Sequence, residues 1–171
     1  MKTLYKWLVV TIMVSLTGCV TVKSNVQADA IPTFKRVLIV TKLRKASEKY
    51  VQGFARQFPR NYDVCTLALT PLSFGNPDEE IRKQVANCQS DVILTLELVQ
   101  RGQSSQYTNV PYEYDVDMKT AATGQPFWKA IVSSNPTYGE QVPPSSIIKR
   151  LLEDHVITGK MASGETAQAI N

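Results

Sequence analysis

Three segments of the chain are continuously apolar and rich in β-branched residues: 35–43, 62–70 and 91–100. Such runs predict strands that are covered on both faces, as in a parallel sheet. Between them, residues 46–58 and 75–88 place their apolar side chains at helical spacing. The resulting order of strand, helix, strand, helix, strand implies right-handed crossovers and parallel pairing.

The pattern changes in the second half of the chain. Residues 112–118 alternate apolar and acidic side chains, and a second strand-like segment follows at 127–134, which together predict an antiparallel hairpin with one face in water. Two prolines then open a final helix, expected over 146–158. The sequence therefore predicts a single mixed α/β domain over residues 34–159, followed by a flexible tail over 160–171.

The first residues form a separate pattern. Lys2 and Lys6 precede a short apolar run, Leu8–Leu16, which is about half the length that a helix needs to span a bilayer. A short apolar core behind a basic segment is typical of an export signal. We therefore expect residues 1–18 to be a cleaved signal peptide.

The residues after this core indicate how the signal is removed. Leu16-Thr17-Gly18-Cys19 resembles the lipobox of bacterial lipoproteins. The resemblance implies cleavage before Cys19, a diacylglyceryl group on its thiol and a fatty acyl group such as palmitate on its new amine. Val20 rather than Asp follows, which resembles the enterobacterial pattern sorted to the outer membrane. The alternative is an ordinary cleavage site at Val26-Gln27-Ala28, which would release a soluble protein that begins at Asp29.

The remaining composition bounds the class of protein. Without residues 1–18, which include Lys2 and Lys6, 17 Lys and Arg stand against 15 Asp and Glu. The charges are mixed and no basic helix stands out, which argues against binding to nucleic acid. Residues 19–33 lack a steady period and approach the domain through Pro32. We interpret them as a lipidated tether between the membrane and the domain.

Two cysteines remain beyond the signal. Cys65 lies in the predicted strand 62–70, and Cys88 lies on the inner face of the helix that follows. An even number of cysteines in an oxidising periplasm favours a disulfide between them. The alternative is two separate buried thiols.

The sequence shows no motif for catalysis or for a cofactor. It has no phosphate-binding glycine loop, no GxSxG elbow and no Cys/His spacing for zinc. The single histidine, His155, falls on the last predicted helix. Glu113, Asp115 and Asp117 could offer oxygens to calcium, but a solvated face that deters edge pairing is the simpler interpretation. We expect no enzyme, no cofactor and no metal.

A group of cations is a candidate binding site for anions. The group surrounds the end of the first predicted strand and the start of the first helix, where open α/β sheets collect ligands. Its members are Lys42, Arg44, Lys45 and Lys49. A glycan or lipid phosphate could bind there; a solvated loop is the alternative.

A group of aromatic residues in the hairpin region is a candidate surface for a protein partner. Exposed Tyr and Trp residues are common in the centres of protein interfaces. We single out Tyr112, Tyr114 and Trp128, with Tyr107 and Phe127 nearby. The alternative is that these rings pack against the last helix.

Two short motifs resemble a group of small bacterial envelope lipoproteins. They are Asp91-Val-Ile-Leu-Thr-Leu and Asp117…Thr123-Gly124…Trp128-Lys129-Ala130. The group includes the penicillin-binding-protein activators, the PelC-type exopolysaccharide lipoproteins and the fold related to the TolB N-terminal domain. The resemblance brings no catalytic residues and implies an accessory or assembly role through protein contacts.

The sequence therefore predicts a non-enzymatic outer-membrane lipoprotein that faces the periplasm. Its partners would be the membrane, through Cys19, and a protein of the cell envelope. The alternative function is binding of an anionic envelope ligand at the cationic group around Lys42. The oligomeric state stays open.

Overall fold

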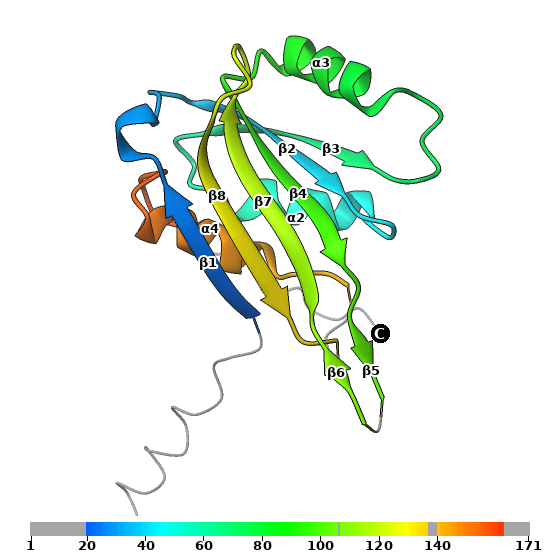
Figure 1. Ribbon diagram of the computed structural model, residues 1–171. Coiled ribbons are helices and arrows are strands. Elements are labelled where there is room, and N and C mark those ends of the chain that lie inside the picture. The colour runs from blue at the N-terminus through cyan, green and yellow to red at the C-terminus, as the bar shows by residue number, and fades with distance from the viewer. Residues whose placement is uncertain (1–19, 106, 137–139, 163–171) are drawn as a thin grey trace, which may run out of the picture.

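The computed structural model describes residues 20–105, 107–136 and 140–162 of the chain. The signal peptide 1–18, Cys19 and most of the expected tail, 163–171, lie outside the described residues. The main body is a six-stranded sheet with the order β1-β8-β7-β4-β2-β3 (Figure 1). Its strands are β1 (Val20–Val26), β2 (Arg36–Lys42), β3 (Asp63–Leu69), β4 (Val92–Gln100), β7 (Tyr112–Thr120) and β8 (Pro126–Ser134). A small second sheet pairs β5 (Gln103–Ser104) with β6 (Asn109–Val110).

The parallel half of the sheet comes from the three apolar runs. β2 pairs in parallel with β3 on one side and with β4 on the other. The helix α2 (Glu48–Gln57) connects β2 to β3, and α3 (Pro77–Cys88) connects β3 to β4. Both begin with side-chain caps, in which Ser47 accepts a hydrogen bond from the amide of Tyr50 and Asn76 accepts one from that of Asp78. The predicted order of elements is confirmed.

The antiparallel half contains the predicted hairpin. β7 pairs with β4 and with β8, and its side chains alternate between the core and the opposite face. The last helix, α4 (Pro144–Glu153), lies beside α2 on one side of the sheet (Figure 1). The chain is thus a single mixed α/β domain, as the sequence predicts.

The two faces of the sheet are covered unequally. The main core lies between the sheet and the helices α2 and α4. On the other face, α3 packs its partly buried Ile81 and Val85 over β2, β3 and the start of β4. No described helix packs over β1, β8 and β7 on that side. We call this exposed surface of β1, β8 and β7 the open face.

The interpretation of residues 19–33 as an irregular tether is wrong for the part that the structure describes. Val20–Val26 forms the edge strand β1, which pairs antiparallel with β8 along its whole length. Val20, Val22 and Val26 pack against the main core, while Thr21, Lys23 and Asn25 are exposed. The period of two is present in the sequence, but the inward position of Ser24 interrupts its apolar side.

The last helix is shorter than predicted. It ends at Glu153, and His155 adopts a left-handed backbone conformation with φ 56°. This turn returns Val156 and Ile157 to the core outside the helix. Met161 also packs against the core, so the first residues of the expected flexible tail are ordered by contacts.

Within the described part of the chain, no helix has both the length and the apolar composition to cross a membrane.

Candidate functional site

A cleft of about 570 Å³ opens where β2, β3 and β4 end. The chain passes from β2 to β3 on one side and returns across β2 to β4 on the other. In open α/β sheets, ligands bind at such a reversal of strand order, outside the carboxyl ends of the strands. The lining residues are Lys42, Leu43, Arg44, Leu69, Thr70, Pro71, Pro77, Glu97, Leu98, Val99 and Arg101. We call this site the switch cleft.

The charge of the switch cleft is positive. Lys42 Nζ forms an ion pair with Glu97 Oε2 at 3.0 Å, which neutralises one cation. Arg44 and Arg101 are exposed, and no hydrogen bond or ion pair to either guanidinium occurs among the described residues. The guanidinium groups of Arg44 and Arg101 are thus exposed at the cleft, where an anion could contact them.

The structure divides the predicted cationic group. Lys42 and Arg44 line the switch cleft, whereas Lys45 and Lys49 lie outside it and are exposed. Arg101 was not among the predicted residues. It follows the end of the third parallel strand, and the rule that ligands collect at the carboxyl ends of strands could have identified it.

The aromatic residues of the hairpin do not form the predicted exposed surface. Tyr114 and Trp128 have exposed fractions of 0% and 1%, and Tyr112 is partly buried against the core. Their polar ends find partners inside the fold: the Tyr114 hydroxyl donates to the Glu140 carbonyl, and Trp128 Nε1 donates to Asp154 Oδ2 at 2.7 Å. An aromatic ring whose polar end is bonded can be buried completely.

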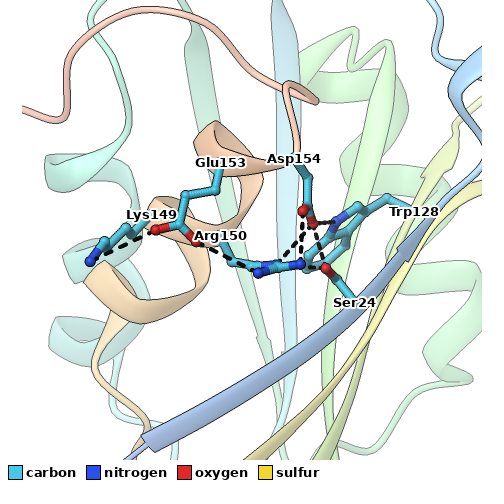
Figure 2. Close-up of polar contacts among 6 residues, drawn as sticks. All are labelled: Ser24, Trp128, Lys149, Arg150, Glu153 and Asp154. Atoms are coloured by element: carbon cyan, nitrogen blue, oxygen red, sulfur yellow. Dashed lines mark hydrogen bonds and ion pairs between the residues drawn. The ribbon is translucent and has the colours of Figure 1, made fainter. Parts of the chain in front are cut away.

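Trp128 belongs to a polar cluster that joins β1, β8 and α4 (Figure 2). The Ser24 hydroxyl donates to Asp154 Oδ2 at 2.5 Å and accepts from Arg150 Nε at 2.6 Å. Arg150 also pairs with Asp154 at 3.1 Å. Burial disfavours the charged form of Asp154, but the hydrogen bonds from Ser24 and Trp128 and the charge of Arg150 outweigh it and lower the pKa. The cluster fastens the N-terminal strand to the C-terminal helix.

The open face carries the acidic row that the sequence predicts. Asp115 is exposed and Asp117 is partly buried, in register with Lys129 on β8. Burial raises the pKa of Asp117, although the charges of Lys119 and Lys129 oppose the rise. A groove of about 650 Å³ runs across this face past Lys23 and Ile131. Acids and lysines therefore stand side by side on the surface.

The remaining predicted sites are placed as follows. Cys65 and Cys88 form a disulfide between β3 and the end of α3, as the sequence predicts. His155 is exposed. Among the described residues, no group of three or more His, Cys, Asp or Glu side chains is arranged to hold a metal ion.

No protein-family model and no curated protein matches the sequence.

Three solved structures are similar in outline. The PelC dodecamer of Paraburkholderia phytofirmans has 10% identity and a TM-score of 0.46, over 82% of this chain and 99% of that one. A single-residue variant of the same PelC has 12% identity and a TM-score of 0.46, over 77% and 95%. The lipoprotein GNA1162 of Neisseria meningitidis has 12% identity and a TM-score of 0.38, over 71% and 95%.

Proposed function

We propose that this chain is a lipid-anchored protein of the bacterial outer membrane, facing the periplasm. It acts there without catalysis, as an accessory or assembly factor that contacts another envelope protein. One observation carries the proposal: Val20, the residue that directly follows Cys19 of the lipobox, is already part of the strand β1 and pairs with β8.

The position of β1 favours the lipobox over the alternative cleavage site. Cleavage after Ala28 would remove the whole of β1, with the three valines that pack on the core and the Ser24 hydroxyl that bonds Asp154. It would also expose the backbone of β8 as a new sheet edge. Cleavage before Cys19 keeps the strand in the mature protein.

The same geometry holds the domain close to the bilayer. Neighbouring Cα atoms are about 3.8 Å apart, so a lipid on Cys19 would lie beside the first residue of the sheet. A diacylglyceryl group with a further acyl chain anchors a protein stably. The proposed protein is therefore a domain seated at the membrane surface rather than one on a long tether.

A role without catalysis agrees with the use of the polar groups. Ser24 places a hydroxyl beside the Asp154 carboxylate. The hydrogen bonds of this pair, including those from Arg150, join β1 to the end of α4. His155 lies exposed, two residues beyond the end of α4.

The open face is the surface that we assign to the protein partner. Its acidic residues on β7 stand beside lysines of β8 and β1, and Ile131 adds an exposed apolar side chain, with an exposed fraction of 51%. Non-obligate protein interfaces have this mixture of polar and apolar groups. The partner would present charges of both signs in the complementary arrangement.

Crosslinking in whole cells tests this assignment. Ile131→Asp should reduce the yield of the crosslinked partner several-fold, because it places a charge in the centre of the contact. Ala86→Asp is the control, since it places the same charge at an exposed site on α3, which packs over β2 and β3 and lies outside the open face; its partner yield should stay at the wild-type level. Thermal melts should show both variants folded. Equal partner yields for Ile131→Asp and the wild type would refute the open face as the contact surface.

A further inference from the structure

The switch cleft and the start of β1 lie at the same end of the sheet. β1 runs antiparallel to β8, β8 to β7, and β7 to β4. β4 therefore ends where β1 begins, and β2 and β3, which are parallel to β4, end on that side as well (Figure 1). We call this side of the domain the anchor end.

Most of the large exposed apolar side chains among the described residues lie at the anchor end. Of five such residues, Leu72 and Phe74 follow β3, Val99 lies near the end of β4, and Tyr107 lies between β5 and β6. Phe74 is fully exposed, at 107%, and Leu72 at 84%. Large exposed apolar groups beside a cleft, as Leu72 and Phe74 are, are typical of a surface that contacts a protein or a membrane.

The loop that carries Leu72 and Phe74 forms one wall of the switch cleft. Thr70, Pro71 and Pro77 of this β3–α3 connection line the cleft directly. Leu43, Leu69 and Leu98 supply apolar surface inside it. The exposed guanidinium groups of Arg44 and Arg101 stand at the same opening. A ligand that fits both features has an anionic group joined to an apolar one.

We propose that the switch cleft binds the phosphate group of an anionic phospholipid, with the apolar part of that lipid against the Leu72–Phe74 loop. Guanidinium groups match the geometry of phosphate and can donate two parallel hydrogen bonds to it. Only the source of the lipid, the membrane beside Cys19, rests on the proposed function. The recognition chemistry rests on the cleft alone.

Titration calorimetry with soluble short-chain lipids tests the proposal on the protein as the cell makes it. Dihexanoyl phosphatidic acid should bind saturably, and dihexanoyl phosphatidylcholine should not, because its choline opposes the two arginines. Inorganic phosphate should bind about tenfold or more weakly than the phosphatidic acid, since it lacks the apolar part. Binding of phosphate as tight as that of the lipid, or no binding of the lipid, would overturn the proposal. So would tighter binding of an acidic peptide.

Variants locate the site. Arg44→Gln and Arg101→Gln should each weaken binding of the phosphatidic acid about tenfold, through loss of a charge-assisted hydrogen bond. Lys45→Gln and Lys49→Gln are matched controls outside the cleft and should leave binding unchanged. Equal losses in all four variants would show a general charge effect and overturn the site.

The apolar part of the site has its own variant. Phe74→Ser should weaken binding of the phosphatidic acid several-fold and leave binding of inorganic phosphate unchanged. The reason is that the exposed ring would contact the apolar part of the lipid, which inorganic phosphate lacks. An equal loss for both ligands would contradict this. The assay works with lipidated or unlipidated protein, so its failure and a failure of the membrane anchor are told apart.

Discussion

Asp91 joins two parallel strands at their amino ends. It accepts hydrogen bonds from the backbone amides of Lys35 and Arg36, at 3.0 and 2.9 Å, and from the Arg36 guanidinium at 3.0 Å. The Lys35 amide, then the Arg36 side chain and amide, lower the pKa of Asp91 to about 2. Folding thus favours the charged carboxylate.

This pKa sets the direction of an acid effect on stability. Because the pKa of Asp91 is lowered in the folded state, its ionisation stabilises the fold above about pH 4. This contribution to the free energy of unfolding is lost as the pH falls towards 2. Asp91→Asn should therefore lower the free energy of unfolding at pH 7 by about 1 kcal/mol, because the carboxylate is partly exposed. The variant should also lose less stability than the wild type between pH 4 and 2.

Denaturant unfolding at several pH values measures both effects. Asp29→Asn, at an exposed position, is the control. Its free energy of unfolding should equal that of the wild type at each pH. Parallel stability curves for Asp91→Asn and the wild type would contradict the role given to Asp91.

Burial of single side chains was the least predictable property at the residue scale. The alternation of residues 112–118 correctly predicted that Tyr112 and Tyr114 lie on the same face of a strand, opposite the acidic side chains. Complete burial of Tyr114 and Trp128 depends on acceptors from distant segments, Glu140 and Asp154. No local pattern indicates such acceptors.

At the scale of elements, α3 is the least buried of the described α-helices. It has no fully buried residue, whereas α2 and α4 each bury several. Its partly buried Ile81 and Val85 rest on the sheet, and the Cys65–Cys88 disulfide joins its last residue to β3. We infer that the disulfide supplies much of the attachment of α3.

Removal of the disulfide tests this inference. The loop that it closes, with a sequence separation of 23, corresponds to about 3 kcal/mol of chain entropy in the unfolded state. The double variant Cys65→Ser/Cys88→Ser should lose about that much stability, and its α3 amides should exchange faster than those of α2. Reduced wild-type protein is the control and should behave alike. Two alkylatable thiols in the exported protein would show that the bond does not form there.

The sequence predicted elements well where a period was unbroken. The parallel half of the sheet was predicted from the apolar runs of β2, β3 and β4 and from the capping residues at the start of α3. β1 was missed because Ser24 occupies an inward position, and the side chains that satisfy it, Asp154 and Arg150, come from the far end of the chain. The end of α4 was misplaced because the left-handed turn at His155 lies among apolar residues that keep the helical spacing.

At the scale of the whole molecule, the two ends of the sheet have different character. In the part of the chain that the structure describes, the anchor end carries the switch cleft, its two exposed arginines and most of the large exposed apolar residues. The sequence indicated Lys42 and Arg44 because they lie at the end of the first apolar run. The same rule could have identified Arg101, which follows the third apolar run. The place of the Leu72–Phe74 loop beside the cleft could not be predicted, since it depends on strand order.

The arrangement of the domain at the membrane depends on where the mature chain begins. The mass of the N-terminal peptide, measured on protein isolated from the envelope, tests this directly. We predict a peptide that begins at Cys19 and carries a diacylglyceryl group on sulfur and an acyl group on the amine, and we predict that Cys19→Ser yields no lipid-bearing peptide. An unmodified peptide that begins at Asp29 would contradict the account, because the mature protein would then lack both the anchor and the strand β1.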